Sequence, residues 1–132
     1  MSEREQSVER ERVIDAPADE VWEALTDERL LSEWLGDEVE LEPYEGGAIS
    51  VRTAGEERRG GVAWVEEGRE LAFTWSRDGD PPSLVELILE PAVAGTRVRV
   101  VERPLAGPVA ISGHAWEERL TALSDAVTLA LV

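Results

Sequence analysis

The side chains that could carry chemistry in this chain are carboxylates, arginines, hydroxyls, five tryptophans and a single histidine. The chain contains no cysteine, so disulfides, thiolate nucleophiles and zinc–sulfur sites are excluded. One histidine cannot build a multi-histidine metal centre. We expect that histidine, His114, at the surface or at the mouth of a site rather than as a general base. The sequence therefore predicts no catalytic set, no metal site and no cofactor.

Glu102 is the most informative of the carboxylates because of its place in an alternating stretch. It shares one face of a predicted strand with Val98 and Val100, so its side chain should point inward. A carboxylate in that position costs several kcal/mol unless it is paired or solvated. Either an arginine neutralises it, with Arg52 as the first candidate, or it lines a mouth that binds a polar group. As an alternative, Glu102 with Arg52 or His114 could form the acid–base pair of a cyclase, dehydratase or hydrolase.

Tryptophan is the dominant aromatic residue, with five copies against one phenylalanine and one tyrosine. This composition favours the recognition of a flat, apolar ligand, although a tryptophan on a strand or helix stripe is more often core. Trp22 is predicted to pack in the interior. Trp64 could face either side of its strand, because Gly60 and Gly61 can introduce a bulge that resets the alternation.

The elements that must position these residues begin with a strand and two short helices. Residues 7–15 alternate weakly and predict a first strand. Pro17 suits the first position of a helix over residues 17–25, with acidic residues in its first turn. Asp27 can cap a second short helix that ends near Leu35.

The middle of the chain, from residue 38 to residue 102, has an apolar period of two and predicts six further strands. Their connections are short and rich in glycine, proline and aspartate, as in hairpins, so the sheet is predicted to be antiparallel. Leu84 and Ile88 fall on the opposite face from their strand's inward residues and could form a homodimer face or pack on a helix. The predicted strands are 38–42, 48–53, 57–66, 69–76, 84–90 and 96–102.

A long helix over about residues 113–131 closes the chain, with one continuous apolar stripe. The only surface large enough to bury this stripe is the concave face of a twisted antiparallel sheet. The prediction is an α+β domain in which a curved sheet of about seven strands wraps a long C-terminal helix. Such an arrangement often leaves a cleft for a small ligand. The stripe consists of Trp116, Leu120, Leu123, Val127 and Leu131.

The size and charge of the chain restrict its partners. A length of 132 residues predicts one domain, 1–132, with residues 1–6 as a frayed tail. The net charge of −16 argues against nucleic acid and against anionic membrane surfaces. The sequence shows neither a signal peptide nor a stretch of apolar residues long enough to span a membrane, so we expect a cytoplasmic protein.

The ordered motifs along the chain resemble the START-like or SRPBCC superfamily, which has the helix-grip fold. More narrowly, the chain resembles the family named after the activator of the heat-shock-protein-90 ATPase. The resemblance covers roughly residues 7–128. It rests on IDAPADEVWEALTD from Ile14, LSEWL from Leu31, YEGGAISVR from Tyr44, RGGVAWV from Arg59, RELAFTW from Arg69, SLVELILEPAVAGTRVRV from Ser83 and WEERLTAL from Trp116.

The resemblance implies a helix-grip fold and a ligand cavity between the C-terminal helix and the sheet. The expected function is the binding of a small apolar or aromatic molecule; the alternatives are the enzyme described above and a chaperone-accessory or other interaction module. The family's co-chaperone has an additional N-terminal domain and this chain begins close to its first strand, so we do not expect a chaperone partner. The implied cavity lining consists of Trp34, Arg52, Phe73, Trp75, Val85, Leu87, Val98, Val100, Glu102, Trp116 and Leu120.

Overall fold

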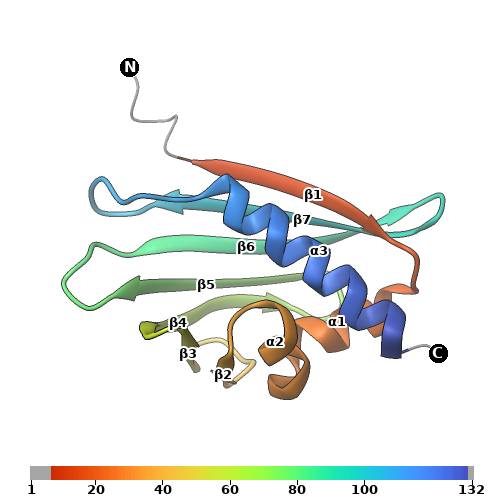
Figure 1. Ribbon diagram of the computed structural model, residues 1–132, viewed down its shortest axis with the longest axis horizontal. Helices are drawn as coiled ribbons and strands as arrows, with labels where there is room; N and C mark the ends of the chain where they lie inside the picture. The colour runs from red at the N-terminus through yellow and green to blue at the C-terminus, as the bar shows by residue number, and fades with distance from the viewer. Residues whose placement is uncertain (1–6, 131–132) are drawn as a thin grey trace.

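The computed structural model describes residues 7–130 as one antiparallel sheet with three helices (Figure 1). The predicted frayed tail and the last residue of the predicted helix stripe, Leu131, lie outside the described residues. Along the chain the elements are β1 (Val8–Ile14), α1 (Ala18–Thr26), α2 (Glu28–Trp34), β2 (Glu38–Leu41), β3 (Ala48–Thr53), β4 (Glu56–Glu66), β5 (Glu70–Arg77), β6 (Ser83–Ala92), β7 (Gly95–Pro104) and α3 (Gly113–Ala130).

The seven strands form a single sheet in the order β1-β7-β6-β5-β4-β3-β2, and every neighbouring pair is antiparallel. From β2 to β7 each strand pairs with the next one along the chain, as the short hairpin connections predict. The turn between β3 and β4 consists of Ala54 and Gly55, which both have positive φ (48° and 80°). Two successive residues of this kind match the twist of the flanking strands in a tight hairpin.

The long helix α3 lies across the concave face of the sheet, with α1 and α2 beside the sheet's other half (Figure 1). Its stripe residues Trp116, Leu120, Leu123 and Val127 are all buried. On β7 the inward residues alternate with exposed or half-buried ones, and β5 and β6 do the same except at Ala72 and Leu84, which lie on the outer face and are also buried. The predicted α+β helix-grip architecture is therefore confirmed.

Local capping follows the sequence closely, with one shift at the first helix. The Asp27 side chain accepts hydrogen bonds from the backbone N–H groups of Arg29 (2.8 Å) and Leu30 (3.2 Å), so it caps α2 as predicted. Pro17 was expected to be the first helical residue, but it is the extended N-cap and the helix begins at Ala18. The missing N–H group of proline costs no hydrogen bond at either position, because the first N–H groups of a helix have no partner within the helix.

The bulge predicted around the glycine pair of β4 lies slightly further along the strand. Gly60 and Gly61 pair regularly with β5, and the register shifts between Val62 and Trp64. Trp64 consequently lies on the outer face, 37% exposed. Gly60 is required for a different reason, because a Cβ atom there would lie 1.6 Å from the backbone oxygen of Thr74.

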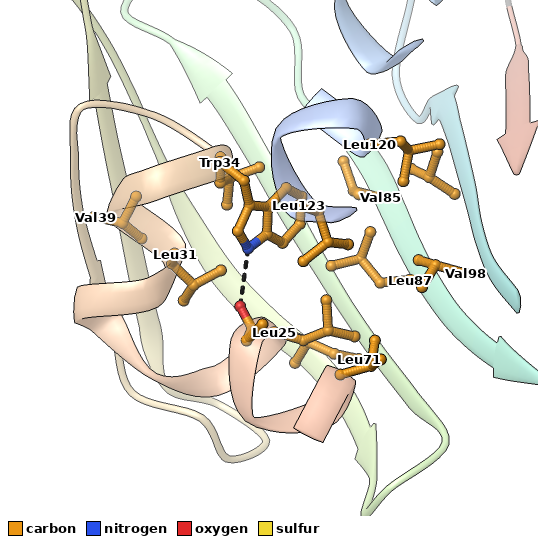
Figure 2. Close-up of a cluster of buried hydrophobic side chains, with 14 of the residues drawn as sticks. Leu25, Leu31, Trp34, Val39, Leu71, Val85, Leu87, Val98, Leu120 and Leu123 are labelled. Carbon is orange, nitrogen blue, oxygen red and sulfur yellow. Dashed lines mark hydrogen bonds between the residues drawn. The ribbon is translucent and has the colours of Figure 1, made fainter. Parts of the chain in front are cut away.

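The core fills the space between the helices and the sheet with interlocking apolar side chains. Figure 2 shows part of it, where α1, α2 and α3 meet β5 and β6. Trp34 of α2 lies at the centre, and its indole N–H donates to the backbone oxygen of Ala24 at 2.8 Å. Among the described residues, no helix is both long and apolar enough to cross a membrane.

Candidate functional site

The candidate site is built around the Glu102 carboxylate, which points inward from β7 as predicted and is only 7% exposed. The indole N–H of Trp75 donates to its Oε2 at 2.8 Å, and the hydroxyl of Ser83 donates to the same oxygen at 2.5 Å. The indole N–H of Trp116 donates to Oε1 at 2.7 Å. Both oxygens of a buried carboxylate are thus held by neutral donors.

Four elements converge to make this arrangement. Trp75 lies near the end of β5 and pairs with Ser83, the first residue of β6, while Val85 on β6 pairs with Glu102 on β7. These registers place the three side chains on the concave face at one end of the sheet. Trp116 lies in the first turn of α3, whose buried stripe directs its indole down onto the same face.

The two indoles also contact one another and other aromatic groups. Trp75 and Trp116 are stacked with ring centroids 6.0 Å apart and an interplanar angle of 26°. Phe73 meets Trp75 edge-on, at 5.4 Å and 72°. The carboxylate therefore rests against the N–H edges of a compact aromatic cluster, which we call the Glu102 cluster: Phe73, Trp75, Ser83, Glu102 and Trp116.

Two arginines cover the faces of these indoles. The guanidinium carbon of Arg119 lies 4.6 Å from the ring centroid of Trp116 and 5.4 Å from that of Trp75. The guanidinium carbon of Arg58 lies 4.8 Å from the Trp75 centroid. Positive charge is thus held on the electron-rich faces of the indoles, while negative charge is held at their N–H edges.

No carboxylate within residues 7–130 is paired directly with the Arg119 side chain. It is half-buried, and within residues 7–130 it forms neither a hydrogen bond nor an ion pair. Burial lowers the pKa of Arg119, and the positive charge of Arg58 lowers it further, against the smaller opposing effects of Glu102, Glu56 and Glu118. The stacking contact holds the cation in place without neutralising it.

Arg58 shares its counter-ion with a second arginine. Oε2 of Glu56 lies 3.2 Å from a nitrogen of Arg58 and 3.1 Å from a nitrogen of Arg77. This oxygen is buried, yet neither arginine has the geometry of a hydrogen bond to it. Arg77 is also paired with Asp80 at 3.0 Å. One imperfectly oriented carboxylate therefore serves two guanidinium groups beside Trp75.

A narrow pocket lies beside Glu102, between the loop after β5 and the loop before α3. Its lining includes Trp75 and Arg58, together with Asp80 and Pro81 from the first loop and Val109 and Ala110 from the second. Its volume is about 10 Å³, enough for about one water molecule. The site is closed in this structure, since its aromatic side chains fill the space beneath α3.

Several predicted partners of Glu102 lie elsewhere. Arg52, the predicted counter-ion, is exposed on the outer face and donates to Glu38 at 2.6 Å. Inward and outward residues alternate on β3, so the side chains of Val51 and Thr53 point inward while that of Arg52 points outward. His114 is exposed on α3 and lies 3.2 Å from Glu118. The acid–base pairs proposed for an enzyme are therefore not formed.

The other predicted lining residues, apart from Arg52, are all buried in the core. Trp75 and Glu102 line the narrow pocket, whereas Trp34 lies among aliphatic side chains about two turns of α3 further on. The sequence analysis missed Ser83, Arg58 and Arg119. The spacing of Arg119 is a signal in the sequence, because it follows Trp116 by three residues and so lies one helical turn away on the same side of the helix.

Within residues 7–130, no three His, Asp or Glu side chains form a group that could bind a metal ion.

A curved antiparallel sheet that wraps a long C-terminal helix is the helix-grip fold, and this chain has that fold with a buried carboxylate beneath the helix. The chain belongs to the family described as activator of Hsp90 ATPase homolog 1-like protein, whose profile matches residues 15–128. No protein of curated function matches the sequence.

Three solved structures illustrate the similarity. DynU16, from the dynemicin biosynthetic locus, is 27% identical with a TM-score of 0.84; the match covers 95% of this chain and 48% of DynU16, so this chain spans about half of that protein. MLL2253 from Mesorhizobium loti is 25% identical with a TM-score of 0.84, covering 93% and 97% of the two chains. CalU16 from Micromonospora echinospora is 28% identical with a TM-score of 0.77, covering 95% and 78%.

Proposed function

We propose that this protein binds a small, flat, largely apolar molecule at the Glu102 cluster, beneath the first turns of α3. The observation that carries the proposal is the buried Glu102 carboxylate, which is held by neutral donors and lines a narrow pocket between two loops. The walls of the binding site would be the aromatic rings of Phe73, Trp75 and Trp116. The carboxylate would accept a hydrogen bond from the ligand.

Stability alone gives no reason to keep a carboxylate in this position. A buried charge loses its hydration, and replacing buried ionic groups by well-packed apolar ones is often neutral or stabilising. Glu102's inward neighbours on β7 and β6, Val100 and Val85, follow that pattern, because they are aliphatic and fully buried. A polar group that lines a pocket among apolar neighbours is what a site needs to orient a ligand.

Binding requires the roof of the pocket to open. A small ligand fills a pocket of roughly 300–1,000 Å³, far more than the closed site provides. The loop over residues 105–112 is irregular, and its described backbone contact with the facing loop is one hydrogen bond, from Leu105 N–H to the oxygen of Pro82 at 3.2 Å. A segment held by so few contacts opens at low free-energy cost. We propose that it moves away when ligand binds.

The test is native mass spectrometry and thermal shift with a library of flat aromatic molecules, on the protein as purified. We expect at least one compound to bind in a one-to-one complex and raise the melting temperature. Glu102→Gln should weaken binding about tenfold or more, because a ligand donor loses a charged acceptor. Glu86→Gln, on the outer face, is the matched control and should bind normally. Unchanged binding to Glu102→Gln, or no binding at all, would contradict the proposal.

A second candidate, favoured by the family match, is stimulation of an Hsp90-type ATPase. Adding the purified protein to such an ATPase tests it directly. A rise in hydrolysis that survives Glu102→Gln would point to a surface-acting role instead of ligand binding. An unchanged rate would remove this candidate.

A further inference from the structure

We propose that the ligand carries an anionic group, most simply a carboxylate, which binds Arg119 and Arg58 at the mouth of the Glu102 cluster. This inference rests on the proposed function and names the class of molecule that the same site would accept. The arginines would bind the end of the ligand that faces the surface, whereas Glu102 would bind the buried end.

The first ground is the unsatisfied guanidinium of Arg119. Its planar group carries five N–H donors, and none is used by a residue between 7 and 130. It is nevertheless half-buried and fixed against two indoles, so its position is set before any ligand arrives. A preorganised guanidinium with free donors matches the geometry of a carboxylate, which it can bind through two parallel hydrogen bonds.

The second ground is the local shortage of counter-charge. Glu102 is the carboxylate nearest to the stacked indoles, but its two oxygens accept their three hydrogen bonds from Trp75, Ser83 and Trp116, and neither Arg58 nor Arg119 donates to them. Glu56 is divided between Arg58 and Arg77 and lacks a well-directed hydrogen bond to either. Arg58 and Arg119 therefore repel each other, and an added anion would relieve that repulsion.

The third ground is the arrangement of the aromatic groups. Both arginines lie against Trp75, so an anion that binds them would be held beside the stacked indoles. A flat ring attached to that anion can then reach the aromatic cluster once the roof opens. A flat aromatic carboxylate combines the two features, and the cationic mouth would select it over a neutral molecule of the same shape.

The experiment compares three probes of similar shape and different charge, each with a ring hydroxyl that can donate to Glu102: hydroxynaphthoate, hydroxynaphthamide and hydroxynaphthylmethylammonium, below called naphthoate, naphthamide and the ammonium compound. Each is titrated into the wild-type protein by isothermal calorimetry at fixed salt concentration. We expect naphthoate to bind at least about tenfold more tightly than the amide, because a hydrogen bond to a charged group contributes roughly twice the free energy of a neutral one. The ammonium compound should bind most weakly, because the two arginines repel its positive charge.

The variants Arg119→Gln and Arg58→Gln should each weaken naphthoate binding by about tenfold to a hundredfold and weaken naphthamide binding less, because a guanidinium binds a neutral carbonyl oxygen more weakly than a carboxylate. The matched control is Arg69→Gln, which removes an exposed arginine at the opposite end of β5 and should change neither. Thermal melting of each variant verifies that it is folded. Because each variant is tested on its own, loss of folding in one still leaves the other as a test.

The outcomes separate the inference from the proposed function. Equal affinity for naphthoate and naphthamide, both weakened by Glu102→Gln, would overturn the anionic class while leaving the ligand site intact. Tightest binding of the ammonium compound would show that Glu102, rather than the arginines, decides the charge of the ligand. Absence of binding by all three probes would contradict both.

Discussion

Two tryptophan clusters line the buried side of α3, and they satisfy their indole groups in different ways. In the Trp34 cluster, which also contains Leu25, Leu31, Leu71 and Leu123, the indole N–H donates to a backbone oxygen and the other neighbours are aliphatic (Figure 2). In the Glu102 cluster, two indoles donate to a buried carboxylate and carry guanidinium groups on their faces.

We infer that this difference distinguishes a cluster that packs the core from one that recognises a ligand. A neutral hydrogen bond inside an apolar cluster is the least costly way to bury a tryptophan. A carboxylate and half-buried arginines add desolvation costs that the fold does not require. We infer that the Trp34 cluster supplies stability, and that the Glu102 cluster gives up some stability to keep polar groups ready for a ligand.

The largest expected effect of substitution lies in the Trp34 cluster. Leu123→Ala removes a fully buried side chain and should lower the free energy of unfolding by about 2–5 kcal/mol, since the remaining cavity cannot collapse completely. Urea denaturation measures the loss. The control Leu129→Ala, at a position that is 73% exposed on the same helix, should change it by less than about 0.5 kcal/mol. Similar losses in both variants would refute the assignment of the core.

A pair of tryptophan substitutions compares the clusters directly. Trp116→Phe leaves Oε1 of Glu102 without its donor and should cost about 1.5–3 kcal/mol, because the abandoned acceptor is charged. Trp34→Phe makes the same change in size but abandons a neutral carbonyl, so its cost should be smaller. Denaturation of the two variants under identical conditions gives the comparison. A greater loss of unfolding free energy in Trp34→Phe would contradict the expectation that a charged acceptor without its donor costs more than a neutral one.

The smallest effect on stability is expected at Arg119. Arg119→Met keeps an apolar stem against Trp116 and loses a stacking contact worth about 0.5–1 kcal/mol. It also removes the repulsion from Arg58 and the cost of burying a charge, so the unfolding free energy should stay within about 1 kcal/mol of the wild type. Denaturation is again the measurement. A loss of more than about 2 kcal/mol would make Arg119 a structural residue.

The fold could be predicted from the sequence because its signals are local and repeated. The alternation of β6 and β7, the cap at Asp27 and the stripe on α3 each depend on residues close in the chain, and all three are as predicted. The exact position of the bulge in β4 was not predictable. It depends on how β4 meets β5, and no pattern within β4 itself records that pairing.

The site could be predicted only in part. Strand parity was enough to turn Glu102 inward, but it could not say which side chains reach it. Charge favours Arg52 as its partner, but the structure places Arg52 on the outer face of the sheet. The sequence does not point to indole N–H groups as partners for the carboxylate, since it offers no local sign that Trp75 and Trp116 meet.

We propose that the Glu102 cluster, and not the Trp34 cluster, receives the ligand. The most direct test is a two-dimensional ¹H–¹⁵N spectrum of the five tryptophan indole groups during a titration with naphthoate. We predict that the indole signals of Trp75 and Trp116 move together as naphthoate binds, while the signal of Trp34 stays in place. Shifts at Trp34 with none at Trp75 and Trp116, or no shifts at any indole, would contradict this account.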